Sequence, residues 1–204
     1  MNTCSEEKTL YSDVRSCQGK KSLPGLRRTI FLASVRDILT YPTMPDRNGE
    51  GMTLAKIPVY SGNFALGQGK KFIRVDIINN DGQVQVEQQG TQGSRTFHVT
   101  ATVNAPGTEE EVTGLISELL NDEIIALVQQ RNGKFRVVGS EAFPATVNPQ
   151  QSTGQSPTDA NQTTLEIVAD DEYPAPFYEG KIPVSDGEMD CKTGKVTEPE
   201  QNPG

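Results

Sequence analysis

The sequence predicts a mainly β fold, either a β-sandwich or a partly closed barrel, with one flanking α-helix, long loops and terminal arms. Three observations lead to this prediction. The 204 residues include 19 Gly and 13 Pro, and frequent turn residues favour all-β architecture over a helical bundle. Several short segments alternate apolar and polar residues with a period of two, which is typical of half-buried strands. One segment alone has a convincing helical period.

The clearest predicted strand spans Arg95–Asn104. Its apolar side chains occupy one face, and Thr96, His98, Thr100 and Thr102 occupy the other. We expect seven to nine strands in all. The other predicted strands are Arg28–Ala33, Asn63–Leu66, Phe72–Ile78 joined as a hairpin to Gln83–Glu87, Glu123–Gln129 joined by a type I′ turn at Asn132–Gly133 to Lys134–Val138, Thr164–Val168 and Phe177–Ile182.

The predicted helix covers residues 108–121. Thr108 and Glu111 have the spacing of a capping box, in which each side chain bonds a free backbone amide at the start of the helix. The apolar residues then recur at helical spacing and form one stripe that should pack on the β core. The stripe consists of Val112, Leu115, Ile116, Leu119 and Leu120.

The chain divides into three parts by composition. Residues 1–26 form a polar N-terminal arm, and residues 27–184 form a single β domain with two long loops, at 42–70 and 140–163. Residues 185–204 are polar and contain Pro and Gly, so we expect a C-terminal tail that is disordered unless a neighbouring subunit holds it.

Charge is unevenly distributed along the chain. The formal net charge is −8, yet residues 1–36 carry +4, so the remaining residues carry −12. An acidic chain lacks the basic footprint of a protein that grips nucleic acid. The basic arm could instead dock on acidic surface of another copy, with Lys20, Lys21, Arg27 and Arg28 as the inter-subunit contact candidates. The alternative is an ordinary solvated leader.

The sequence points away from membrane insertion and from catalysis. No stretch of 18 apolar residues is present, the N-terminus lacks the apolar region of a secretory signal, and three Cys near the ends do not form a disulfide framework. His98 stands alone in a Thr-rich strand face, so we interpret it as a structural or surface residue, and Gly67–Lys71 as a turn. We therefore predict no enzyme activity and no catalytic, cofactor-binding or metal site.

Five stretches carry a resemblance to a known family. They are Cys17–Leu23, Pro106–Asp122 continuing through Ile124–Val128, Gly133–Gly139, Thr153–Thr164 and Pro174–Ile182. In these stretches the chain resembles the tail tube (major tail structural) proteins of tailed bacterial viruses, over residues 15–184.

The resemblance implies a virion subunit that forms rings of six copies, stacked into a hollow tail tube through which viral DNA passes into the host. The implied partners are other copies of the chain and other tail proteins, such as the tape measure and the tail terminator, with viral DNA only transiently in the lumen and no membrane. Assembly would take place in the host cytoplasm, and the protein would reside in the virion tail. The alternative is a virion decoration or glycan-binding β-sandwich, which needs exposed aromatic side chains for stacking on sugars. The five Tyr are the candidates for that role.

Overall fold

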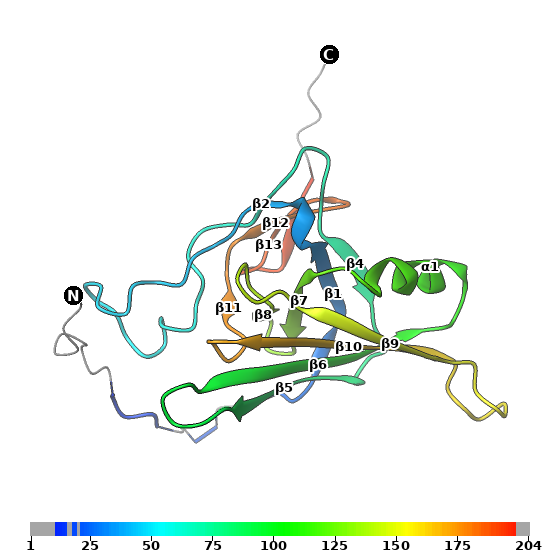
Figure 1. The fold of residues 1–204 in the computed structure, drawn as a ribbon, viewed down its shortest axis with the longest axis horizontal. Helices are drawn as coiled ribbons and strands as arrows, with labels where there is room; N and C mark the ends of the chain where they lie inside the picture. The colour runs from blue at the N-terminus through cyan, green and yellow to red at the C-terminus, as the bar shows by residue number, and fades with distance from the viewer. Residues whose placement is uncertain (1–10, 16–17, 20, 199–204) are drawn as a thin grey trace, which may run out of the picture.

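A computed structural model describes residues 11–15, 18–19 and 21–198, and its architecture is mainly β. Two larger sheets pack face to face (Figure 1). The front sheet has the strand order β5-β6-β10-β9, and the central sheet has the order β11-β8-β7-β1-β4. The front strands run across Figure 1, whereas β1 and β7 behind them run from top to bottom, so the two sheets cross steeply, as in orthogonal sheet packing.

Two smaller sheets complete the fold, one of β12-β13-β14 and one of β2-β3. The elements are β1 Leu26–Ser34, the 3₁₀ turn Val35–Asp37, β2 Ile38–Thr40, β3 Ala65–Leu66, β4 Ile73–Asp76, β5 Gly82–Gln89, β6 Thr96–Pro106, α1 Glu110–Leu119, β7 Ile124–Gln130, β8 Phe135–Val138, β9 Thr146–Ser152, β10 Gln162–Asp171, β11 Phe177–Tyr178, β12 Lys181–Val184, β13 Gly187–Asp190 and β14 Lys195–Thr197. The prediction of a mainly β fold with one flanking helix is confirmed.

The central sheet is covered on both faces, which explains its continuous apolar strands. In β7 every residue from Ile124 to Val128 is at most 1% exposed. Ile124, Ala126 and Val128 face the front sheet, whereas the side chains between them belong to a second core. Strands buried on both faces lose the alternation of polar and apolar residues because neither side meets water. The second core lies beneath the two small sheets and includes Phe64, Phe72, Tyr178, Ile182, Met189 and Cys191.

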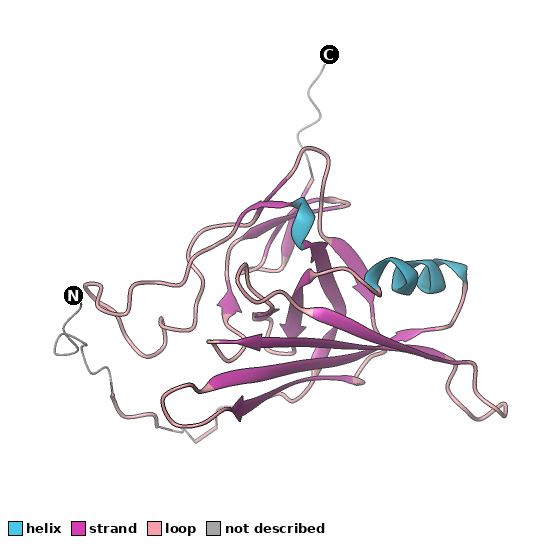
Figure 2. Ribbon diagram, viewed as in Figure 1, coloured by secondary structure: helices cyan, strands magenta, loops and turns pink. Residues whose placement is uncertain are grey.

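The helix α1 covers an open end of the sandwich between the two larger sheets (Figure 2). Leu119 is buried, and Leu115 and Ile116 pack against the main core, so most of the predicted stripe is confirmed. Leu120 is an exception, with 61% of its surface exposed just beyond the helix. The predicted capping box is also wrong, because Glu109 precedes the first helical turn and makes no side-chain cap.

The predicted loop 140–163 contains a strand. Thr146–Ser152 pairs with β10 along its whole length as β9, and residues 140–145 and 153–161 remain as shorter connections. Its sequence has weak alternation and a proline, Pro149, that is tolerated because β9 lies at the edge of the sheet.

The predicted C-terminal tail is wrong for the residues that the structure describes. Residues 187–190 and 195–197 form β13 and β14, and these pair with β12 as a meander on the second core. Met189 and Cys191 are 5% and 1% exposed, so the folded β domain continues past residue 184. Residues 177–182, predicted as one strand, are divided between β11 and β12 by a break at residues 179–180.

Two predicted hairpins differ from the structure. Strands β4 and β5 do not pair with each other, because β4 pairs with β1 and β5 pairs with β6, so the intervening turn carries the chain from the central sheet to the front sheet. The β7–β8 hairpin forms, but its turn is not type I′. Gly133 has a positive φ of 93° and Asn132 does not, which is typical of a type I turn followed by a glycine bulge.

The predicted loop 42–70 is irregular apart from β3 and isolated bridges at its base. The hydroxyl of buried Tyr178 anchors the end of this loop. It accepts a hydrogen bond from the Phe64 amide at 3.1 Å and donates one to the Lys181 carbonyl at 2.8 Å. The Asn63 side chain also accepts a hydrogen bond from the Lys181 amide at 2.9 Å. The two chain segments are therefore fixed to each other.

Candidate assembly surfaces

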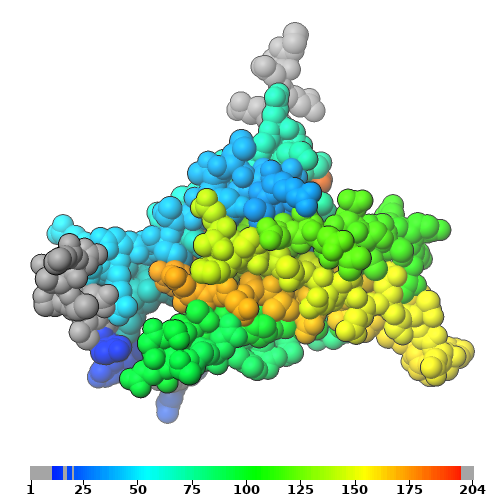
Figure 3. All heavy atoms as spheres, in the orientation of Figure 1, coloured from blue at the N-terminus to red at the C-terminus, as the bar shows by residue number. Residues whose placement is uncertain are grey.

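The front sheet has one face on the core and one open polar face. Along each strand the residues alternate between the two, so the register fixes which side chains share the open face. The open face consists of Gln83, Gln85, Glu87, Gln89, Thr96, His98, Thr100, Thr102, Asn104, Pro106, Thr146, Asn148, Gln150, Ser152, Gln162, Thr164, Glu166, Val168 and Asp170. Figure 3 shows the four strands as successive bands across this side of the molecule.

The open face is negatively charged. It contains three carboxylates, Glu87, Glu166 and Asp170, and no Lys or Arg. The register places Glu87 and Asp170 on either side of His98. His98 Nδ1 lies 2.7 Å from Asp170 Oδ1, and Gln89 donates to the same oxygen at 2.7 Å. The bond from His98, more than that from Gln89, holds the pKa of Asp170 below its ordinary value. Asp170 therefore stays ionised at neutral pH.

Both edges of the front sheet lack a strand partner among the described residues. At one edge, β5 presents Val84 and Val86, which are only half-buried against the core. At the other edge, β9 lies close to α1, where Gln151 donates to the Thr113 hydroxyl at 3.1 Å. An unpaired edge presents backbone donors and acceptors that another strand can satisfy.

The structure describes three of the four predicted contact residues. Lys20 lies outside the described residues, and Lys21 lies in an extended segment in which every described residue from Tyr11 to Gly25 is exposed. Arg27 and Arg28 are exposed but belong to the start of β1, not to the arm. The three described candidates are therefore divided between the exposed arm and the first strand of the folded body.

Two irregular segments project from opposite ends of the front sheet (Figure 2). One is the loop before β3, and the other is the tip between β9 and β10. The Asp159 carboxylate fixes that tip by accepting hydrogen bonds from the amides of Gln155 and Ser156 at 2.9 and 2.8 Å. These bonds lower the pKa of Asp159.

Three of the five Tyr line one open cavity of about 360 Å³. They are Tyr41, Tyr60 and Tyr173, and exposed Phe143 stands beside them. Of the other two, Tyr178 is buried at 1% exposure and Tyr11 is 88% exposed on the arm. The cavity is thus the place where aromatic side chains meet solvent together.

The described residues form neither a metal-ligand cluster nor a reactive thiol site. Within residues 11–15, 18–19 and 21–198, no three His, Cys, Asp or Glu side chains are grouped as metal ligands require. No helix in this part of the chain is long and apolar enough to cross a membrane. Cys191 is a buried free thiol, and burial raises its pKa to about 12, so it is a poor nucleophile.

Comparisons with known proteins returned no match: no family model, no curated protein and no solved structure resembles the chain significantly. The surfaces described above therefore have to be interpreted from their own geometry and charge.

The negative charge of residues 37–204 suits an acidic wall, but the sequence does not show which acids share the open face. The polar face of β6 was visible in the alternation of Thr96, His98 and Thr100. Glu87 and Asp170, however, come from β5 and β10, and only the strand register places them beside that face. The alternation of polar and apolar residues in β5 and β10, combined with the correct pairing of both strands with β6, would have identified these two acids.

Proposed function

We propose that this chain is a structural subunit of a viral tail tube, in which copies assemble into stacked rings, six to a ring, around a lumen for DNA. The observation that carries the proposal is the front sheet: it has an open, polar, negatively charged face and two edges that no strand within residues 21–198 covers. The resemblance to tail tube proteins supports the same conclusion.

The edges supply the contacts within a ring. If β5 of one copy pairs with β9 of the next, the front sheets join into one continuous sheet, and a closed ring leaves no edge free. The contact joins two different surfaces of the chain, so it repeats around a ring rather than ending at a dimer. The half-buried Val84 and Val86 become fully buried in such a joint.

The open face supplies the wall of the lumen. Glu87, Glu166 and Asp170 repel the DNA phosphates, and the absence of Lys and Arg on the face prevents the counterion release that holds DNA on proteins. The Gln, Thr and Asn side chains keep the wall hydrated. DNA can then move through without being bound.

Stacking of rings uses the projections at the ends of the front sheet. The loop before β3 and the β9–β10 tip extend from the body, as do the described residues of the N-terminal arm (Figure 2). Tail partners such as the tape measure and the tail terminator would meet the lumen and the last ring. The protein would reside in the virion tail after assembly in the host cytoplasm.

Electron microscopy of the purified full chain at high concentration, alone and with its tail partners, tests the proposal. We expect rings or tubes. Val86→Lys places a charge at the β5 edge and should abolish them, whereas Val196→Lys, the same change at a 44% exposed position in β14, should not. Circular dichroism melting checks that both variants fold. A wild-type chain that stays monomeric even with its tail partners would contradict the proposal.

The alternative of a glycan-binding decoration module has one observation in its favour, the cavity lined by three tyrosines. Three carboxylates also line that cavity, and a neutral sugar would leave their charge unbalanced. Binding of labelled neutral oligosaccharides by the purified chain, without ring formation, would favour this second function.

A further inference from the structure

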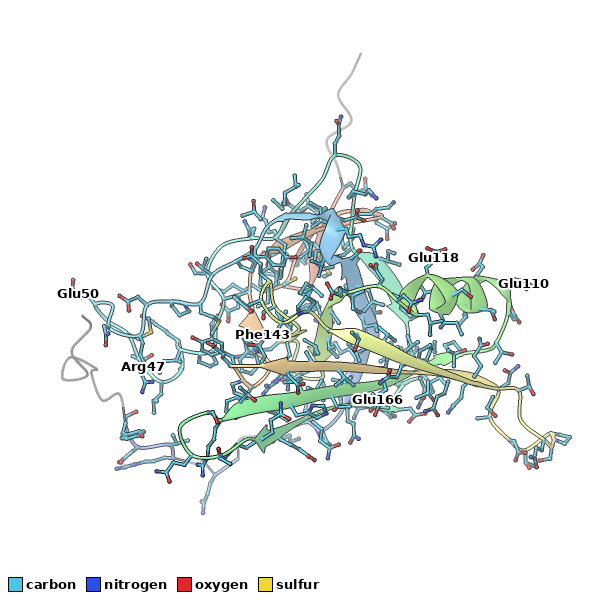
Figure 4. All side chains as sticks on the ribbon, viewed as in Figure 1. Arg47, Glu50, Glu110, Glu118, Phe143 and Glu166 are labelled. Carbon is cyan, nitrogen blue, oxygen red and sulfur yellow. The ribbon has the colours of Figure 1, made fainter. Side chains whose placement is uncertain are left out.

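The tyrosine-lined cavity is a site that ring formation through the front sheet does not use. Four segments build it: the start and the end of the loop between β2 and β3, the β8–β9 connection and the end of β10. Its lining residues are Tyr41, Pro42, Thr43, Met44, Tyr60, Phe64, Gly139, Ser140, Glu141, Ala142, Phe143, Asp171, Glu172 and Tyr173. Figure 4 labels Phe143, which lies beside the projecting loop that carries Arg47 and Glu50.

The cavity has negative charge and no positive charge of its own. Glu141, Asp171 and Glu172 line it, without any Lys, Arg or His. Asp171 is only 5% exposed, and its carboxylate accepts hydrogen bonds from the amides of Glu172 and Tyr173 at 2.6 and 3.4 Å. Burial raises the pKa of Asp171. Among the described residues, no basic side chain lies within salt-bridge distance of these three acids. A cation entering the cavity would relieve this imbalance.

The aromatic walls suit the same kind of ligand. Tyr60, Tyr173 and Phe143 provide ring surface at the cavity, and a Lys or Arg side chain can place its methylene stem and its charge against such rings. Tyr41 contributes another ring, and its buried hydroxyl has no hydrogen-bond partner among the described residues. Aromatic rings combined with unpaired carboxylates match an alkyl ammonium or guanidinium group.

The chain carries a segment with that chemistry. Residues 8–25 contain four basic residues and one acid, and Lys20 and Lys21 are adjacent. Every described residue of the arm is exposed, and none of these described residues lines the cavity of its own chain. Exposed Tyr11, Val14 and Leu23 also leave apolar surface on the arm uncovered. Lys20 and Lys21 precede Leu26, the first residue of β1, by six and five residues, and a chain of that length spans at most roughly 20 Å, enough to meet a subunit packed directly against this end of β1.

We propose that this cavity receives a lysine side chain, Lys20 or Lys21, from the N-terminal arm of a second copy. This proposal rests on the tail tube function. It adds the site on one subunit that binds the N-terminal arm of another when rings stack. The carboxylates at the rim steer the basic arm, and the rings hold the inserted side chain.

The test measures binding of the arm separately from ring formation. The probe is a fluorescein-labelled synthetic peptide of residues 8–25 carrying Cys17→Ser. The receptor is the full chain with Lys20→Gln and Lys21→Gln, so that the arms of other receptor copies do not compete with the peptide for the cavity. We expect saturable binding by fluorescence anisotropy that weakens as salt rises. Adding Glu141→Gln and Glu172→Gln to the receptor should weaken it about tenfold, since exposed ion pairs and cation–π contacts are individually modest.

Two matched controls complete the test. Glu110→Gln with Glu118→Gln removes the same charge from α1, away from the cavity (Figure 4), and should leave binding unchanged. A peptide in which both lysines are Gln should bind at least tenfold more weakly. Equal binding by the cavity and helix variants would overturn the proposal, as would displacement of the peptide by a neutral oligosaccharide. If rings form in the microscope but the peptide does not bind, the arm proposal fails while the tail tube function stands.

Discussion

His98 Nδ1 lies 2.7 Å from Asp170 Oδ1, and this contact joins the central strands β6 and β10 across the open face of the front sheet. His98 is the one histidine of the chain. Its cross-strand neighbour on the other side is Glu87. The pair lies on the two central strands near one end of the surface that we assign to the lumen, because β6 begins at Thr96 and β10 ends at Asp171.

The first prediction concerns the pKa of Asp170, which the hydrogen bond from His98 lowers more than the one from Gln89. His98→Ala should raise that pKa toward its ordinary value of about 3.9, and Gln89→Ala should raise it less. Because the pKa is depressed in the folded state, the stabilisation from Asp170 is present above the unfolded pKa and is lost as pH falls through the folded value. Carboxyl ¹³C NMR titration measures both shifts. An unchanged Asp170 pKa in His98→Ala would refute the assignment.

The second prediction concerns the charge of the open face. Replacing Glu87 and Glu166 by Lys should make the assembled protein retain duplex DNA at low salt, because the wall then releases counterions from the phosphates. Binding of labelled duplex, measured by anisotropy, should fall steeply between low and high salt. The control variant carries Glu110→Lys and Glu118→Lys on α1, which make the same change in charge away from the open face. If that control binds DNA as tightly, the open face is not the DNA-facing wall.

The third prediction concerns packing of α1. Leu119 is 6% exposed and belongs to the main core, so Leu119→Ala should lower the free energy of unfolding by about 2–5 kcal/mol. Leu120 is 61% exposed, and Leu120→Ala should change the free energy of unfolding by less than about 0.5 kcal/mol. Urea denaturation followed by circular dichroism compares the two. Equal losses would show that the helix is rotated relative to the structure described here.

The fourth prediction contrasts two glycines. A Cβ at Gly180 would lie 2.6 Å from the Tyr178 hydroxyl and 2.7 Å from the Gly62 carbonyl, so Gly180→Ala should destabilise the fold by about 1–3 kcal/mol. A Cβ at Gly114 in α1 meets nothing within 4 Å, and Gly114→Ala should stabilise the helix by up to about 1 kcal/mol. The melting temperature should therefore fall for Gly180→Ala and rise for Gly114→Ala. A rise in melting temperature for Gly180→Ala would contradict the close packing around Tyr178.

Much of the local structure was predictable from the sequence. The alternation in Thr96–Asn104 determined both the strand and its buried face, and Val99, Ala101 and Val103 are indeed buried. The apolar run Ile124–Val128 and the helical stripe ending at Leu119 were equally informative. In each case, hydrophobic burial depends on side chains that the local sequence specifies, and their spacing reports the geometry of the backbone.

Strand pairing and the short polar strands were decided only in the tertiary structure. Backbone hydrogen bonds are available to every residue except proline, so the alternation in Ile73–Asp76 and Gly82–Gln89 could not show that these strands belong to different sheets. Likewise, Thr146–Ser152 and Gly187–Asp190 are strands because β10 and β12 lie beside them, since their own side chains give little signal. The same non-local register brings Glu87, Glu166 and Asp170 onto one face. The sequence by itself determined the buried face of β6 and the burial of the β7 run, whereas only long-range backbone pairing decided which charges share a surface.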